Sequence, residues 1–192
     1  MRPIGNMRMQ DELYIKRIQN GEMECFSHIV EHYSKPVFLL LCRIVRNQED
    51  AEELTQDVFL KIYRTLKDFQ GNSLFSTWLY RIAYNTAISY TRKKKQEFLY
   101  IEEQTIQNIP DKDVDETFEN TVTGDHLQAL HKAIDQLSPE ERGIITLFYM
   151  EEKTIEAIAE VTGLSSSNVK VKLHRTRKKL YLLLNSDRNK LV

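Results

Sequence analysis

The chain has 192 residues and a formal net charge of −1, with 27 Lys and Arg against 28 Asp and Glu. Six Gly and four Pro are too few for a β-rich fold that must turn often, so composition favours an all-α protein. The two Cys lie in apolar surroundings, as expected for reduced thiols of a cytoplasmic protein, and no stretch resembles a signal peptide or a membrane span.

The small net charge conceals a strong segregation along the chain. Residues 81–95 carry five basic side chains and no acid, whereas residues 96–125 carry nine acids against Lys112 alone. A second basic block between Ser166 and Leu180 has six Lys and Arg and again no acid. Two basic blocks around an acidic middle are typical of a nucleic-acid binder.

Three helices are predicted in the first 70 residues, after a loose leader at residues 1–9 in which Met1, Met7 or Met9 is the start. The first helix spans about 11–20 and ends at Gly21, and the second runs from about 26 to 45 through Pro36. The third begins at Asn47, with Asp50 at the capping position three residues later.

The third helix carries acid on one side, where Glu49, Glu53 and Asp57 recur at i, i+4 and i+8. This row could be a solvated face, a docking face for a basic partner, or a divalent-metal site of a nuclease. A metal site needs ligands that converge from several directions, and the neighbouring helices supply no second motif. A further candidate metal group has no evident fourth ligand: Cys25, His28 and His32.

The next predicted helix, at residues 75–95, combines aromatic side chains with a basic end. Its aromatics are Phe75, Trp78, Tyr80, Tyr84 and Tyr90. Aromatics interleaved with cations suit unstacked bases, which offer a π-face and a backbone charge together. The alternative for Trp78 is a place in the core.

Residues 96–124 lose periodicity and are dominated by acid, which predicts a linker with little structure of its own. Order returns at Leu127, and Ser138-Pro139-Glu140-Glu141 is a strong helix start with a capping box and Pro at the first helical position. The chain is thus predicted to form two small helical domains, 1–95 and 125–192, joined by a flexible acidic linker.

Residues 154–180 predict a helix-turn-helix. Thr154 can cap the first helix, Gly163 supplies the turn, and Ser165 or Ser166 can cap the second. The second helix has an apolar stripe at i, i+4, i+7 and i+11, formed by Val169, Leu173, Thr176 and Leu180. Its unopposed positive charge favours a recognition helix that enters the DNA major groove.

These motifs together resemble those of bacterial RNA polymerase sigma factors of the extracytoplasmic-function group in the sigma-70 family. The matching stretches begin at Asp50 (DAEELTQDVFLKIYR), Phe75 (FSTWLYRIAYNT), Leu137 (LSPEER) and Ile155 (IEAIAE, continuing to Lys179). They occur in the family's order and spacing and cover about residues 10–95 and 125–184. The resemblance implies a region 2 helical bundle and a region 4 helix-turn-helix.

The resemblance also implies roles for the first domain. The acidic third helix is expected to dock on the clamp helices of the largest polymerase subunit through Glu53, Gln56, Asp57 and Leu60. The loop at residues 71–74 and the following helix are expected to capture a flipped base of the −10 element and to help open the duplex. The residues implied there are Ser73, Phe75, Ser76, Trp78, Arg81, Asn85 and Arg92.

The second domain is implied to read the −35 element and to contact the flap of the second-largest subunit. Lys170, Val171, His174 and Arg175 are expected to face bases, and Ser166, Asn168, Lys172 and Lys178 to hold phosphates. Val171 and Lys172 depart from the small polar residue and the Arg most common in the family, which leaves the base sequence read at −35 open.

The function implied is a promoter-specificity subunit without catalysis or cofactor of its own, acting in the cytoplasm on core polymerase and promoter DNA. The family also implies an anti-sigma protein, often membrane-bound, that covers both DNA-binding domains. The alternatives are a stand-alone helix-turn-helix regulator, which leaves the third helix and residues 75–95 without a role, and the metal-dependent nuclease.

Overall fold

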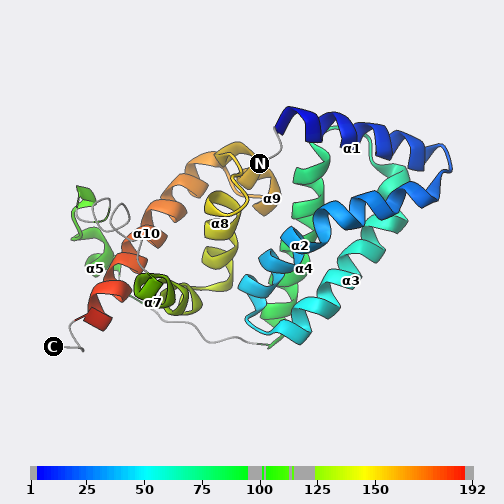
Figure 1. The fold of residues 1–192 in the computed structure, drawn as a ribbon. Helices are drawn as coiled ribbons and strands as arrows, with labels where there is room; N and C mark the ends of the chain where they lie inside the picture. Colours follow the sequence, from blue (N-terminus) through cyan, green and yellow to red (C-terminus); the bar gives the residue numbers. More distant parts are fainter. Residues whose placement is uncertain (1–3, 95–100, 102, 113, 115–123, 189–192) are drawn as a thin grey trace.

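The computed structural model of the chain describes residues 4–94, 101, 103–112, 114 and 124–188, and all regular structure among them is helical (Figure 1). The first half holds four long helices: α1 (Ile4–Gln19), α2 (Phe26–Val45), α3 (Gln48–Thr65) and α4 (Phe75–Lys94). Among the described residues of the second half, the helices whose bounds are given are α5 (Glu103–Gln107), α7 (Gly124–Asp135), α8 (Pro139–Tyr149), α9 (Ile155–Thr162) and α10 (Ser166–Arg188). The predicted all-α fold with two helical domains is confirmed.

The predicted helix starts are present in atomic detail. Asn47 Oδ1 accepts a hydrogen bond from the Asp50 amide at 2.8 Å and caps α3. Ser138 and Glu141 exchange the two bonds of a capping box at the start of α8. Each bond satisfies an amide that the first turn of a helix leaves without a partner, so these short motifs set where the helices begin.

The prediction of a loose leader is wrong for residues 4–9, because α1 begins at Ile4. Residues 7–10 are Met, Arg, Met and Gln, all good helix formers, and no proline interrupts them. The helix therefore extends beyond the apolar positions on which the prediction rested. Residues 1–3 lie outside the described residues.

Helix α2 is the centre of the first domain. It packs against α3 and α4 and buries an apolar stripe that includes Ile29, Val37 and Ile44. Pro36 lies inside α2 without ending it, as predicted. The helices that carry the acidic face and the aromatic-basic face are thus held on one support.

The second domain packs directly on the first. Helix α8 contacts α2 and α4, and α9 contacts α4 (Figure 1). Buried side chains of both domains form one apolar cluster, in which Leu79 of α4 and Ile144 of α8 are completely buried. The prediction of a linker with little structure of its own is wrong for residues 103–109, because α5 forms there and Ile106 and Ile109 are buried.

Candidate nucleic-acid interface

The acidic face of α3 is exposed to solvent. Glu53, Gln56, Asp57 and Leu60 are all exposed, and their spacing puts them on one helix face. The opposite face, which includes Leu54 and Val58, is buried against α2. Leu60 is 52% exposed and Tyr63, one turn further on, is 43% exposed. Sequence reasoning missed Tyr63, which extends the acidic face with a second exposed apolar surface.

Asp50 is not part of this exposed acidic face, because its carboxylate pairs with Lys94 at the basic end of α4. Its carboxylate accepts hydrogen bonds from the Lys94 ammonium at 2.9 and 3.1 Å. The Tyr90 hydroxyl and the Lys94 ammonium hold the pKa of Asp50 below its usual value. The contact joins the N-terminus of α3 to the C-terminus of α4, so part of the basic cluster is already neutralised within the domain.

The aromatic residues at the start of α4 form a cluster rather than an exposed row. Phe75 lies with its ring centroid 5.8 Å from those of both Phe69 and Trp78 and is only 5% exposed. Trp78 is half-buried against the core. Phe75 is therefore buried and packs against the ring of Trp78.

The other residues singled out on this element lie closer to solvent. Ser73 and Ser76 are half-buried, and Arg81, Asn85 and Arg92 are exposed. Trp78, Arg81 and Asn85 are spaced by three and four positions, so they share one helix face. The structure thus brings an aromatic ring, a cation and an amide together on α4.

The helix-turn-helix has the predicted local geometry. Thr154 Oγ1 accepts a hydrogen bond from the Ala157 amide at 3.2 Å, and Gly163 ends α9 with φ +75°. Ser165 rather than Ser166 caps α10, accepting from the Asn168 amide at 3.2 Å. The predicted stripe of α10 is buried in full: Val169, Leu173, Thr176 and Leu180.

The burial of that stripe turns most of the −35 candidates outward. Asn168, Lys170, Val171, His174 and Arg175 are exposed, and Ser166 and Lys172 are half-buried. Lys178 is the exception, since only 8% of the residue is exposed. Its ammonium lies 2.8 Å from Asp111 of the linker.

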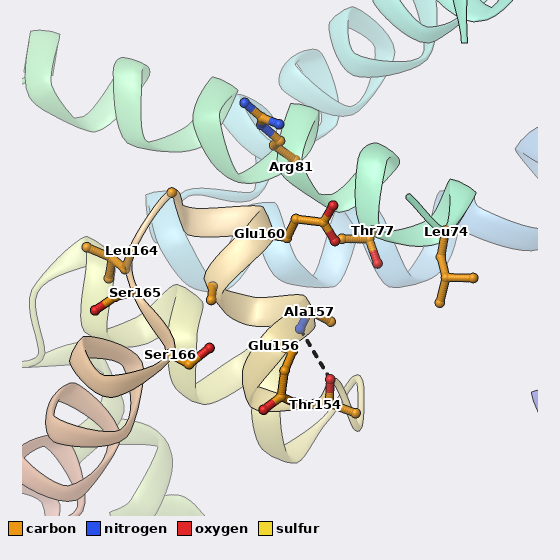
Figure 2. Close-up of a pocket in the computed structure, with 12 residues that line it drawn as sticks. Leu74, Thr77, Arg81, Thr154, Glu156, Ala157, Glu160, Leu164, Ser165 and Ser166 are labelled. Atoms are coloured by element: carbon orange, nitrogen blue, oxygen red, sulfur yellow. Dashed lines mark hydrogen bonds between the residues drawn. The ribbon is translucent and has the colours of Figure 1, made fainter. Parts of the chain in front are cut away.

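A groove of about 650 Å³ is open between the first half of α4 and the helix-turn-helix, beside the contact of α4 with α9. Arg81, Thr77 and Leu74 line it from the first domain, and the facing wall comes from α9 and the turn before α10 (Figure 2). Ser166, singled out for phosphate, lines the same groove as Arg81. Residues expected at opposite ends of a promoter thus lie beside one cavity in this conformation.

Buried polar contacts hold the two domains together. The Arg142 guanidinium of α8, fully buried, donates to the Ile44 carbonyl at 2.6 Å across the domain boundary and to the Leu137 carbonyl at 2.6 Å. Burial lowers the pKa of Arg142 to about 10, so the group remains charged at neutral pH. The sequence predicted only the start of a helix at residues 138–141 and gave no indication of this contact.

Two further contacts cross the same boundary around α8. The Tyr80 hydroxyl donates a hydrogen bond to the Glu151 carboxylate. The Glu140 carboxylate accepts from Lys172 of α10 at 3.1 Å and lies 3.7 Å from Arg92 of α4. Glu140 therefore lies beside one cation of the −35 candidates, Lys172, and one cation of the −10 candidates, Arg92.

No metal chemistry is supported by the part of the chain that the structure describes. Within it, no group of three or more His, Cys, Asp and Glu side chains could hold a metal ion. Cys25 is buried, and His28 stacks on Tyr14 with ring centroids 4.5 Å apart. Among the described helices, none is long and apolar enough to cross a membrane.

Comparison with known proteins identifies both domains. Residues 29–97 match the family model of sigma-70 region 2, and residues 127–180 match that of sigma-70 region 4. The chain is 30% identical over 183 residues to the ECF RNA polymerase sigma factor SigW of Bacillus subtilis, covering 91% of this chain and 96% of that protein. It is also 30% identical to the ECF RNA polymerase sigma-E factor of Escherichia coli K12, covering 88% of this chain and 92% of that one.

Solved structures share the fold. CnrH, in complex with the cytosolic domain of CnrY, matches with a TM-score of 0.65 at 21% identity over 93% of this chain and 99% of that one. The sigma factor RpoE of Bartonella quintana, in complex with the anti-sigma factor NepR, matches with a TM-score of 0.62 at 21% identity, covering 84% and 98%.

Proposed function

The chain belongs to the extracytoplasmic-function group of RNA polymerase sigma factors and directs transcription initiation, and from this premise we propose which of its surfaces do so. The observation that carries the proposal is the match of both sigma regions, in order, along a relative of nearly the same length. Residues 1–95 are assigned to polymerase docking and the −10 element, 96–124 to a linker, and 125–192 to the −35 element.

The acidic face of α3 is proposed to bind the clamp helices of the largest polymerase subunit. Glu53, Gln56, Asp57 and Leu60 support this because they are exposed together on one face, while the opposite face of α3 is buried in the core. The mixture of two carboxylates, an amide and an apolar side chain suits a docking surface with an apolar centre and a polar rim. The second domain is assigned the contact with the flap of the second-largest subunit.

The start of α4 is proposed to hold the opened −10 strand. Flipping a base out of a duplex costs a few kcal/mol, which stacking and strand contacts must offset. Trp78 and the exposed Arg81 and Asn85 supply a ring, a charge and a hydrogen-bonding amide on one face. Ser73, Ser76 and Arg92 extend this surface, and buried Phe75 supports the ring of Trp78 from below.

Helix α10 is proposed to read the −35 element from the major groove. Lys170, Val171, His174 and Arg175 are assigned to base edges, and Ser166, Asn168, Lys172 and Lys178 to phosphates. Phosphate contacts give affinity and register but little choice of sequence, so two weak DNA-binding surfaces gain from being held on one polymerase.

The chain is proposed to work in the cytoplasm without an active site of its own, and to be held inactive by an anti-sigma protein. Two proteins of the same fold were solved in complexes, CnrH with the cytosolic domain of CnrY and RpoE with the anti-sigma factor NepR. A candidate anti-sigma domain should compete with core polymerase for the chain and block run-off transcription. The stand-alone regulator is not favoured, because residues 29–97 match a sigma region that it leaves unexplained.

The test is reconstitution with core polymerase. The Glu53→Lys/Asp57→Lys variant should lose affinity for core by at least about tenfold, which corresponds to about 1.4 kcal/mol, and should abolish run-off transcription. The matched control is Glu31→Lys/Asp68→Lys, which makes the same change in charge at exposed positions outside the acidic face. Both variants should keep the helical circular dichroism of the wild type.

Two results would contradict the proposal. Transcription at the wild-type level by Glu53→Lys/Asp57→Lys would remove the docking assignment. Failure of the wild-type chain to bind core polymerase, with tight duplex binding by the chain alone, would instead favour the stand-alone regulator.

A further inference from the structure

The described part of the linker lies against the recognition helix. Helix α5 contacts α10, beside which it runs in Figure 1. Ile106, Ile109 and Val114 are 2%, 8% and 3% exposed, so this segment has an apolar side that is removed from water. Burying side chains of this size is strongly favourable, at about 1.5–3 kcal/mol for each one fully buried. The linker therefore has a physical reason to be at this place.

Asp111 extends from the same segment onto two side chains of α10, the Lys178 ammonium and the His174 imidazole. Its Oδ1 lies 2.8 Å from the Lys178 ammonium and 3.4 Å from His174 Nε2. The Lys178 side chain is 10% exposed in this arrangement, whereas that of Asp111 is 68% exposed. The hydrogen bond from Lys178, with support from His174, holds the pKa of Asp111 below its usual value. Asp111 is consequently ionised at neutral pH.

Both partners of Asp111 belong to the surface assigned to the −35 element. A carboxylate and a phosphate offer a cation the same kind of charged oxygen acceptor. Lys178 cannot present its ammonium to DNA while Asp111 covers it, and an ionised Asp111 repels an approaching phosphate.

We propose that the linker docks on α10 as an intramolecular substitute for a DNA phosphate, so that −35 binding requires Asp111 to leave Lys178 and His174. The occupant of this face of α10 is the chain's own segment 103–114. The inference rests on the proposed role of α10 as the −35 reader, which it deepens by adding a competitor within the same molecule.

Docking of the linker on α10 also limits how far the two domains can move apart. About 30 residues separate Lys94, where α4 ends, from Gly124, where α7 begins. Fully extended, such a segment reaches about 100 Å. With residues 103–114 docked on α10, only the eight residues 95–102 remain between α4 and the docked segment, a reach of about 28 Å. Release of the linker both uncovers Lys178 and lets the domains separate.

The test measures binding of the full chain to a fluorescent mixed-sequence DNA duplex by anisotropy across a salt series. Asp111→Asn removes the charge and should tighten binding about two- to fivefold, the range expected for one exposed ion pair. Unmasking Lys178 adds one phosphate contact, so the slope of log K against log salt should steepen by about 0.9. The control is Asp68→Asn, which removes one exposed carboxylate near the end of α3.

A second variant addresses the apolar part of docking. Ile106→Ser/Ile109→Ser should release the segment and tighten DNA binding at least about tenfold, because two buried aliphatic side chains no longer favour the docked state. In a Lys178→Gln background, Asp111→Asn should bring little further gain. Carbodiimide should also join Asp111 to Lys178 as an amide in the free chain, and core polymerase should reduce that product.

The outcomes separate this inference from the proposed function. The proposed masking of Lys178 by Asp111 is overturned if Asp111→Asn and Asp68→Asn increase DNA affinity equally. It is also overturned if Asp111→Asn increases DNA affinity equally in the wild-type and Lys178→Gln backgrounds. Either result leaves the −35 assignment of α10 standing. Failure of Lys170→Ala to weaken DNA binding would refute α10 as the reader, and the masking with it. A gain specific to Asp111 and dependent on Lys178 supports both.

Discussion

Replacing Gly143 with Ala probes how tightly the two sigma domains are docked. Gly143 lies in α8 at the domain boundary, where an added Cβ would be 2.7 Å from Tyr84 Cε2 and 3.1 Å from Ile44 Cδ1. Tyr84 is 5% exposed and Ile44 is completely buried, so neither side chain can move into solvent. A methyl group at 143 must therefore push α8 away from α2 and α4.

The added methyl group has two opposing effects, one on docking and one on the stability of α8. Overpacking a well-filled core costs about 1–3 kcal/mol. Within a helix Ala is preferred over Gly by about 0.5–1 kcal/mol, which stabilises α8 itself. The clash is the larger effect, because carbon atoms pack best at about 3.5–4.0 Å and the closest approach here is 2.7 Å. Because α8 stays helical when the domains separate, the helix preference acts only on unfolding. The clash alone therefore sets the cost to docking, about 1–3 kcal/mol, which lowers the ratio of docked to separated molecules about 5- to 150-fold.

Small-angle X-ray scattering measures this ratio directly. Gly143→Ala should increase the radius of gyration while leaving the helical circular dichroism unchanged, since the domains separate without unfolding. Adding Tyr84→Leu removes the ring that the methyl group meets and should restore part of the docking. The reasoning is refuted if Gly143→Ala keeps the wild-type radius of gyration and melts at a higher temperature, because helix preference would then outweigh the clash.

Two further predictions concern α8. Arg142→Met should lower the free energy of unfolding by about 1–3 kcal/mol, because the Ile44 and Leu137 carbonyls lose their buried charged donor. Urea denaturation measures the loss, and Arg142→Lys, which keeps the charge without the planar fork, is the variant for comparison. Burial alone would raise the pKa of Glu141, but Lys179 and Ser138 together hold this pKa below its ordinary value of 4.5. The stabilisation of the folded state by ionised Glu141 is therefore complete above pH 4.5 and is lost as the pH falls through the lower folded-state pKa. Glu141→Gln should therefore differ most from the wild type at neutral pH and least in acid, and a constant difference in unfolding free energy across that range would contradict the assignment.

The parts of the fold that sequence could predict depend on contacts between near neighbours. Asn47, Ser138 and Thr154 each bond to an amide three residues away, so the motif contains the whole interaction. The stripe of α10 was predictable for a similar reason, because helical geometry alone aligns Val169 with Leu173. The exposure of Glu53 and Asp57 follows in turn from the apolar face opposite them.

The interactions that sequence could not predict join distant segments. Arg142 looks like a surface residue of a helix start, and only the approach of α2 explains its burial against Ile44. Nothing near Lys178 indicates that Asp111, 67 residues earlier in the chain, covers it. Phe75 shows the same limit, since its place under Trp78 depends on the loop that also carries Phe69.

The closed arrangement also fixes an order of events under the proposed assignment. The −10 and −35 elements lie about 25 base pairs apart, or roughly 85 Å along the duplex. Arg81 and Ser166 line one groove here, so the docked domains cannot read both elements and must separate first. The acidic face of α3, however, is exposed in the closed state and lies on the far side of α2 from α8 (Figure 1). Polymerase can therefore bind α3 before the domains open, and its binding energy is available to offset the loss of the Arg142 contacts. Lys178, by contrast, stays covered by Asp111 until the linker leaves, so the complete −35 surface becomes available only after that release.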